Sequence, residues 1–412
     1  MRRTLIPLLL GSFVLAAAFG LMPPAAQAQP KTVKIGLIAP MSGPWARQGY
    51  LKKLGAEMAI EEINQRGGIK ALGGAKIELV IADAGDSAEK AKNAAQRLVS
   101  QEPDLVGGMG AWLSSFTLAV TEVTEREHIP WLTLSFSDKI TERGFNYVFQ
   151  SSPTAGTQAD KAVPALVDLA KAATGKAPSK AAIIMDNTAS PVAFTKPMRE
   201  GGLKQLGIDL VVDEIFTPPL SDATPMVQKL RSTRPDMVFL VSTSVPDDKL
   251  ILEKMVEFKL GRERLPVVAN GVAFGAPELL QAIGKEQLEG LMFICANWGL
   301  KGQEALIERF KKRTGELWFT QDSASSYGHA WILKEAMEKA KSADREKVNQ
   351  AIHELNLTSG PAASVFAGGV KFEPNGRRSG AVTLVVQWQN GVPVTVYPPE
   401  VALAKPVWSK GQ

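Results

Sequence analysis

The sequence lacks the short motifs that mark most metal sites and many active sites. It contains one cysteine and three histidines, and no H-E-x-x-H, C-x-x-C or calcium-loop pattern occurs, so no metal site has specific support. The hydrolase motif G-x-S-x-G is missing, and the GGMG stretch at residues 107–110 matches neither a P-loop nor the dinucleotide motif G-x-G-x-x-G. We therefore expect no catalytic residues, no metal and no cofactor.

The cysteine content and the charge balance exclude further classes of protein. The single cysteine, Cys295, cannot form an internal disulfide, and its apolar neighbours predict that it packs in a core. Neither sign of charge dominates, because 47 basic and 42 acidic residues give a formal net charge of +5. The densest basic cluster, residues 311–313, is typical of the exposed end of a helix, so we expect no nucleic-acid partner.

The sequence has one long apolar run, which lies at the N-terminus, and no other run of that length follows it. Arg2-Arg3 precedes an apolar run over residues 5–22, and the small-x-small triplet at 26–28 is typical of a cleavage site. We expect a secretory signal peptide over residues 1–28, cleaved after about Ala28, and therefore a periplasmic protein. A membrane anchor is the alternative interpretation, which the two prolines directly after the run disfavour.

Apolar strands alternate with amphipathic helices over most of the chain. One such series extends from about Val33 to Ile140 and a second from about residue 181 to 296. The strand segments contain few polar residues, which is typical of a parallel sheet covered by helices on both faces. Helical segments follow, and the chain turns to strands again from Val370. Because the length exceeds the usual size of one core, we expect two domains.

The helices and strands at the C-terminal end of the chain are best divided between these two units. We expect a first lobe over residues 29–153 and 296–377 and a second lobe over residues 154–295 and 378–412. The chain would then cross between the lobes more than once. Several short connections allow two lobes to hinge without separating, which suits closure around a ligand.

Three loops of the first series are candidates for ligand binding. In a parallel sheet, the carboxyl ends of the strands and the amino ends of the following helices share one edge, where ligands usually lie. In GGMGAWLSSFTLAV, residues 107–120, the glycines would allow a tight turn, and Ser114 or Ser115 could cap the helix. Such a helix terminus favours a carboxylate. The alternative is that these serines only cap a helix.

The other two loops are MSGPWARQG, residues 41–49, and LTLSFSD, residues 132–138. Both follow strands of the same series and carry hydroxyl groups or glycines. Trp45 projects from the first loop, where it would either line the ligand site or cover the core. The residues leave both interpretations open.

The order of these segments resembles the periplasmic branched-chain amino-acid binding proteins of ABC transporters, the Leu/Ile/Val-binding type. The resemblance includes KIGLIAPMSGPWARQG, LVSQEPDLVGGMGAWLSSFTLAV and IPWLTLSFSDKITERGFNYVFQSSPT, and it extends over nearly the whole mature chain. It implies an α/β fold with two Rossmann-like lobes, parallel-rich sheets and three hinge crossovers, the type I periplasmic binding protein. It also implies a partner permease in the inner membrane, and we expect a monomer.

The resemblance also implies where a ligand would bind. The carboxylate-binding serine of the family aligns with Ser114, and its backbone and threonine contacts align with Ser135 and Ser137. The glutamate that holds an ammonium group in this family aligns with Asn270. Because a buried ammonium with only neutral partners costs several kcal/mol, this substitution argues against an amino acid.

The tyrosines that surround the pocket in this family are also replaced. Gln48, Ser190 and either Thr243 or Ser244 stand at those positions. Trp45 and Phe136 are then the aromatic groups left to line the apolar part. We therefore predict that the ligand is a small carboxylate without an ammonium group, either an aromatic acid or a 2-oxo acid.

Two alternatives remain beside this prediction. The first is a branched-chain or other hydrophobic amino acid, whose ammonium group would pair with Asp186, Asp247 or Asp248 on second-lobe loops. The second is a secreted α/β enzyme, because many serine, aspartate and asparagine residues lie on the expected cleft loops. The missing catalytic motifs make it the weaker hypothesis.

Overall fold

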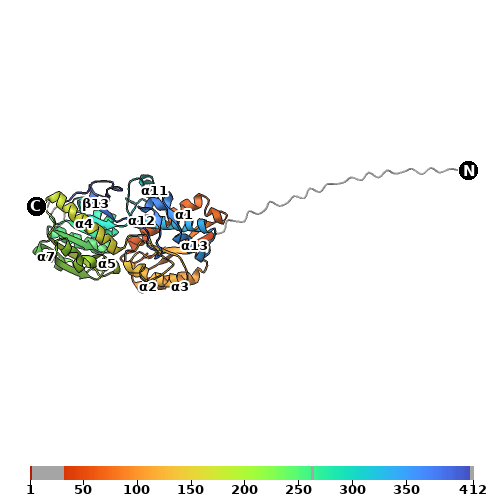
Figure 1. The fold of residues 1–412 in the computed structure, drawn as a ribbon, viewed down its shortest axis with the longest axis horizontal. Coiled ribbons are helices and arrows are strands. Elements are labelled where there is room, and N and C mark those ends of the chain that lie inside the picture. Colours follow the sequence, from red (N-terminus) through yellow and green to blue (C-terminus); the bar gives the residue numbers. More distant parts are fainter. Residues whose placement is uncertain (2–31, 261–263, 409–412) are drawn as a thin grey trace.

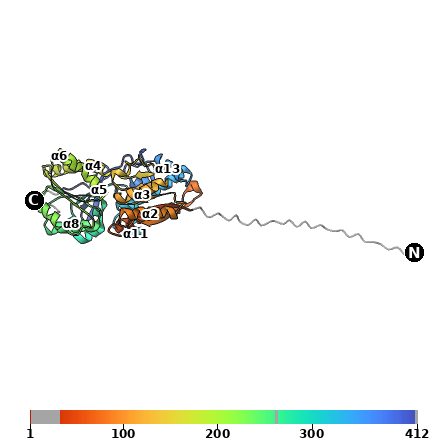
Figure 2. The same ribbon diagram turned by 90° about the horizontal axis from the view of Figure 1, so that it is seen from below.

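The computed structural model describes residues 32–260 and 264–408, together with Met1. The predicted signal peptide over residues 1–28 therefore lies, except for Met1, outside the described residues. The described chain forms two α/β lobes that lie side by side along the long axis of the molecule (Figures 1 and 2). The expected fold class is confirmed, because each lobe has its own parallel-rich sheet. Within the described residues, no helix is long and apolar enough to cross a bilayer.

The first lobe is built on a five-stranded parallel sheet in the order β2-β1-β3-β4-β5. Its strands are β1 (Thr32–Ala39), β2 (Lys76–Asp83), β3 (Gly107–Gly110), β4 (Trp131–Thr133) and β5 (Val148–Gln150). One core lies between the sheet and helices α2 (Ala88–Gln101) and α3 (Ser114–Arg126). A larger core lies under α1 (Ala46–Gln65) and α12 (Gln321–Ala340) on the other face.

The second lobe is built on a seven-stranded sheet in the order β14-β13-β10-β9-β8-β6-β7. Its parallel strands are β6 (Lys180–Asp186), β7 (Asp209–Phe216), β8 (Met237–Val241), β9 (Val267–Asn270) and β10 (Met292–Cys295). Strands β13 (Leu384–Gln389) and β14 (Val392–Tyr397) extend it as an antiparallel pair. Cys295 is fully buried in the core of this lobe, as expected.

Helices cover both faces of the second sheet. Helices α4 (Ala155–Thr174) and α5 (Ala189–Pro197) pack on one face, and α5 continues through the π-helical turn η3 (Met198–Gly202) into the short helix α6 (Leu203–Gln205). The other face is covered by α7 (Thr224–Thr233), α8 (Val245–Glu257), α9 (Pro277–Ile283) and α10 (Lys285–Leu288).

The chain passes between the two lobes three times, after β5, after β10 and before β13. Between the second and third passages it contributes α11 (Glu304–Thr314), α12, α13 (Arg345–His353) and α14 (Gly360–Val365) to the first lobe. A two-stranded sheet of β11 (Asn356–Leu357) and β12 (Val370–Lys371) lies in the same segment. The single-turn helices are η1 (Lys70–Leu72), η2 (Asp138–Ile140) and η4 (Val272–Gly275).

The glycines at residues 107–110 form strand β3 itself, so the prediction that they make a ligand-approaching turn is wrong. A Cβ atom on Gly108 would lie 2.2 Å from the ring of Trp131, and one on Gly110 would lie 1.9 Å from the carbonyl oxygen of Ile38. Trp131 and the neighbouring strand therefore fill the space that side chains would need. These glycines serve packing inside the sheet.

Helices α1 and α12 approach each other closely, and this contact positions the site. A Cβ atom on Gly55 of α1 would lie 2.0 Å from the carbonyl oxygen of Ser323 in α12. The Ser323 hydroxyl donates to the carbonyl of Leu51 at 2.8 Å, and the Ser326 hydroxyl donates to that of Lys52 at 2.7 Å. The glycine and the serines thus bring the Lys52 segment directly against the amino-terminal turn of α12.

Candidate functional site

A cavity lies between the two lobes, at the carboxyl ends of their central strands. The segments that line it follow β3 and β4 in the first lobe and β6, β8 and β9 in the second, which is the usual edge for ligands in such sheets. Its lining is Lys52, Trp112, Leu113, Ser114, Leu134, Ser135, Phe136, Ser190, Pro191, Ser242, Thr243, Asn270, Gly271, Val272, Ala273, Gln321 and Asp322.

Most of the residues that the sequence predicts to bind a ligand line this cavity together. They come from two segments of the first lobe and three of the second. These residues are Ser114, Ser135, Phe136, Ser190, Thr243 and Asn270. Their contact with a ligand stays a prediction, and the structure defines the surroundings in which it would occur.

Trp45, Gln48 and Ser137 are buried but do not line the cavity. The Trp45 ring packs edge-on against Phe116, with ring centroids 5.6 Å apart, in the core under α3. Trp45 therefore covers the core, which is one of the two interpretations that the sequence left open. Gln48 is only 2% exposed on α1, and the backbone N–H of Ser137 donates to the Ser114 hydroxyl oxygen at 3.1 Å.

Ser114 holds the loop after β4 and does not cap its helix as expected. The N-cap residue of α3 is Leu113, and no side chain caps this terminus. The Ser114 hydroxyl oxygen instead accepts hydrogen bonds from the backbone N–H groups of Phe136 and Ser137, each at 3.1 Å. Both lone pairs are then engaged, and the hydroxyl hydrogen is left to donate to an acceptor in the cavity.

Ser135 connects the same loop to the start of α3. Its hydroxyl donates to the carbonyl of Trp112 at 2.7 Å and lies 2.6 Å from the Thr117 hydroxyl. The Thr133 hydroxyl also donates to it, at 3.1 Å. Because its proton is already used, Ser135 is better placed to hold Trp112 than to donate to a ligand.

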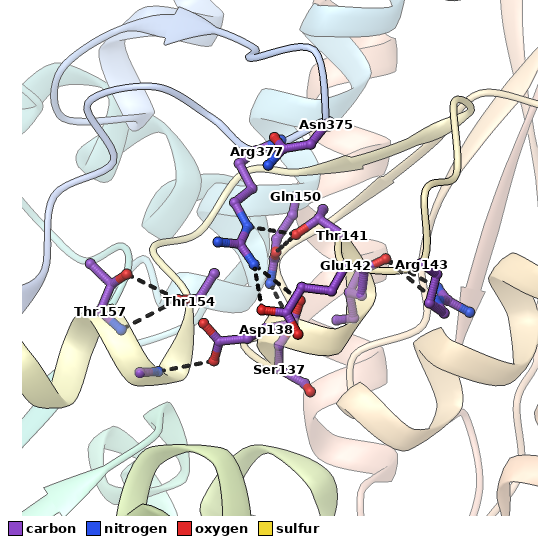
Figure 3. Close-up of polar contacts among 12 residues, drawn as sticks. Ser137, Asp138, Thr141, Glu142, Arg143, Gln150, Thr154, Thr157, Asn375 and Arg377 are labelled. Carbon is purple, nitrogen blue, oxygen red and sulfur yellow. Dashed lines mark hydrogen bonds and ion pairs between the residues drawn. The ribbon is translucent and has the colours of Figure 1, made fainter. Parts of the chain in front are cut away.

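Polar side chains of Gln150, Thr141 and Arg377 support this loop (Figure 3). The Gln150 amide donates to the carbonyls of Ser135, at 2.7 Å, and Ser137, at 3.1 Å. Its oxygen accepts from the Thr141 hydroxyl at 3.2 Å, and Arg377 donates to that hydroxyl at 2.7 Å. Arg377 lies in the third passage between the lobes, so the loop after β4 is tied directly to a crossover.

The cavity also holds a cation and a carboxylate that the sequence did not reveal as site residues. Lys52 of α1 is 3% exposed, and its ammonium donates to the Ser325 hydroxyl at 3.3 Å. Asp322 of α12 is 1% exposed and accepts from the indole N–H of Trp112 at 2.7 Å. Burial lowers the pKa of Lys52 and raises the pKa of Asp322 to about 6.

Trp112, which contacts Asp322, adopts an unusual backbone conformation. Its φ angle is 84°, in the left-handed region that bulky residues rarely occupy. Such residues persist where the surroundings over-determine them, and they gather at ligand sites. Here the contacts to Ser135 and Asp322 fix the backbone and the indole of Trp112 at the wall of the cavity.

The acids proposed to receive an ammonium lie behind the second-lobe wall and do not line the cavity. Asp186 accepts from the backbone and hydroxyl groups of both Thr188 and Thr243. Asp248 accepts from the Ser242 hydroxyl, and Asp247 accepts from a backbone N–H at 2.9 Å. Burial raises the pKa of all three carboxyls. Each therefore has hydrogen-bond donors within the second lobe, and none of the three lines the cavity.

Polar contacts join the two lobes beside α1 and α9. Arg47 of α1 pairs with Glu278 of α9, at 2.7 Å, and with Glu316, at 2.6 Å. The indole of Trp318 donates to the carbonyl of Gly275 in η4 at 2.7 Å. First-lobe segments thus hold the second-lobe loop that follows Asn270. In the described part of the chain, no group of three or more potential metal ligands comes together.

Comparisons with known proteins agree with one another and match nearly the whole described chain. A family model described as periplasmic binding protein matches residues 32–392. Leu/Ile/Val-binding protein homolog 7 of Brucella suis biovar 1 is 30% identical over 382 residues, which are 90% of this chain and 93% of that protein.

Two solved structures illustrate the range of ligands among proteins of this fold. A branched-chain amino acid transporter substrate binding protein of Streptococcus pneumoniae, in complex with isoleucine, superposes with a TM-score of 0.74 at 19% identity, over 89% of this chain and 100% of that one. An ABC transporter solute binding protein of R. palustris, in complex with benzoate, gives 0.74 at 17% identity, over 92% and 98%. At these identities the likeness concerns the fold.

Proposed function

Because this chain belongs to the periplasmic binding protein family, we propose that it captures a small carboxylate, an aromatic acid or a 2-oxo acid, between its two lobes. As a solute-binding protein of an ABC transporter, it would deliver this acid to a permease in the inner membrane. We further propose that the lobes comprise residues 29–153 with 296–377 and residues 154–295 with 378–412, and that the protein acts as a monomer. Closure of the lobes around the acid would create the shape that the permease recognises.

The observation that carries this proposal is the neutral wall of the second lobe. Every second-lobe residue that lines the cavity is uncharged: Ser190, Pro191, Ser242, Thr243, Asn270, Gly271, Val272 and Ala273. Asn270, 3% exposed, donates from its amide to the Gln158 side chain at 3.0 Å. An ammonium placed here would meet only neutral acceptors, at a cost of several kcal/mol, whereas an amide can donate to a carboxylate or keto oxygen.

The rest of the lining suits the remainder of such a molecule. The Ser114 hydroxyl hydrogen is free to meet a carboxylate oxygen, and Trp112, Leu134 and Phe136 add apolar surface nearby. Pro191 and Val272 face them from the second lobe. A flat ring or a branched alkyl chain would bury its apolar surface there.

A matched pair of ligands tests this proposal most simply. Leucine and 4-methyl-2-oxopentanoate have the same carbon skeleton and differ only in an ammonium or a keto group. We expect thermal shift and calorimetry to show stabilisation by the oxo acid, by phenylpyruvate or by benzoate, and weaker or no binding of leucine. Benzamide serves as the control that lacks the carboxylate. Binding of leucine with no binding of any acid would contradict the proposal.

Binding of a hydrophobic amino acid is the second candidate, and Asp322 is the observation that favours it. This carboxylate lines the cavity from the first lobe, where it could receive an ammonium group. The resemblance to Leu/Ile/Val-binding proteins agrees with this alternative. It predicts the reverse order of affinities for the matched pair.

A further inference from the structure

The cavity contains one ammonium and one carboxylate, both supplied by the first lobe. Lys52 of α1 and Asp322 of α12 attract each other through space, but among the described contacts the Lys52 ammonium has one hydrogen-bond partner, Ser325, at 3.3 Å. One Asp322 oxygen accepts from the Trp112 indole at 2.7 Å. An ammonium can donate three hydrogen bonds, so Lys52 has donors to spare at the cavity wall.

We infer that Lys52 pairs with the carboxylate of the ligand and that Asp322 takes up one proton from solvent when the acid binds. This inference rests on the proposed function and names the residues that would select an acid. A ligand carboxylate beside Lys52 would place two anions and one cation in a nearly dry space. Protonation of Asp322 restores the balance, and the protonated group can donate to a keto or carboxylate oxygen of the ligand.

The groups around Asp322 determine the direction of this coupling. From α1, Lys52 and Arg47 favour the charged carboxylate, although Arg47 is also paired with two glutamates. On its own helix, His329 has a pKa lowered well below its ordinary value by burial, so this residue is neutral. Burial outweighs the two cations and raises the pKa of Asp322 to about 6. A bound acid adds a negative charge nearby and would raise it further.

The coupling gives acids and amines opposite responses to pH. The affinity for an acid should rise as the pH falls, because the proton that Asp322 needs becomes available. The affinity for an amino acid should fall over the same range, because its ammonium would lose a carboxylate partner. The sign of the response thus identifies which charge of the ligand faces these residues.

Calorimetry with benzoate and 4-methyl-2-oxopentanoate between pH 5 and pH 8 tests this inference on the wild-type protein. With an Asp322 pKa of about 6, we expect affinity to rise up to about 100-fold from pH 8 to pH 5. Titrations at pH 7 in two buffers of different ionisation enthalpy should show net proton uptake. Neither measurement requires a variant, so both remain valid if a variant fails to fold.

Two variants separate the roles of the residues. Asp322→Asn retains an acceptor for the Trp112 indole and should remove most of the pH dependence. Lys52→Met should weaken acid binding at least about 30-fold, since it truncates one partner of a buried ion pair. Lys53→Met is the matched control, because Lys53 is more exposed and pairs with Glu57 at the surface, at 3.7 Å. We expect it to change affinity by less than about twofold.

The outcomes distinguish this inference from the proposed function. If no acid binds at any pH, both are overturned. If an acid binds with an affinity independent of pH and unchanged by Lys52→Met, the inference is overturned and the proposed function stands. An acid affinity that falls as the pH falls would overturn the inference alone. Binding of leucine with an affinity that falls as the pH falls, with no acid bound at any pH, would assign the pair to an ammonium ligand and overturn both.

Discussion

Ser114 accepts two hydrogen bonds, so its removal should lower the stability of the protein, whatever the ligand is. Its hydroxyl oxygen accepts from the backbone N–H groups of Phe136 and Ser137, which are 8% and 2% exposed. Ser114→Ala would leave two buried donors without a partner, and each unsatisfied group costs about 1–3 kcal/mol. We therefore expect the free energy of unfolding to fall by about 2–6 kcal/mol.

Urea unfolding monitored by circular dichroism measures this effect. Ser115→Ala is the control, since Ser115 is a neighbour on the same turn of α3 and has no hydrogen bond to the loop after β4 among the described contacts. In calorimetry, Ser114→Ala should also weaken acid binding, by about 1–3 kcal/mol, because the hydroxyl donor is lost. A variant as stable as the control would show that Ser114 does not hold the loop.

Two other perturbations follow from the charged groups at the cavity. The pKa of Asp322 is raised from 3.8 to about 6, so its stabilising contribution is complete below pH 4 and is lost as the pH rises through 6. In urea unfolding of the free protein, the free energy of unfolding of the wild type should fall by up to about 3 kcal/mol over this pH range, and that of Asp322→Asn should fall much less. Equal falls would show that Asp322 is not the cause. Glu278→Gln breaks the pair between Arg47 and the second lobe, so stopped-flow measurements should show acid release accelerated about two- to fivefold, with Glu286→Gln as an exposed control. No acceleration would mean that this pair does not hold the lobes closed.

The fold was predictable because the relevant signals are local or follow the order of the chain. Alternating apolar runs and amphipathic helices gave two parallel-rich sheets, and the antiparallel end of the second sheet follows from the turn-separated strands after Val370. The glycines of β3 were predicted to form a turn because glycine is a turn signal in sequence. The packing of Gly108 depends on the side chain of Trp131, which lies 23 residues further along the chain.

The site was only partly predictable, since several of its features depend on packing between distant segments. Lys52 stands beside Lys53 in the sequence, and nothing in their spacing tells which lysine faces the cavity. The answer comes from Gly55, which lets α12 approach α1 and bury Lys52 while Lys53 stays at the surface. Asp322 becomes a site residue through the same contact.

The second-lobe acids show the opposite case, in which the sequence suggested more than the structure supports. Asp186 and Asp248 lie next to loops that line the cavity, so their spacing agreed with a ligand role. Threonine hydroxyls from those loops bind both oxygens of Asp186, and the Ser242 hydroxyl binds one oxygen of Asp248. Hydroxyl residues adjoining an acid at a strand end were the signal that pointed to internal hydrogen bonds.

The central claim is that the cavity receives an acid without an ammonium group. The most direct test is mass spectrometry of the small molecule released when the protein, purified from periplasm without added ligand, is denatured. Our account predicts an aromatic acid or a 2-oxo acid in near-stoichiometric amount. An amino acid released in that amount would contradict it.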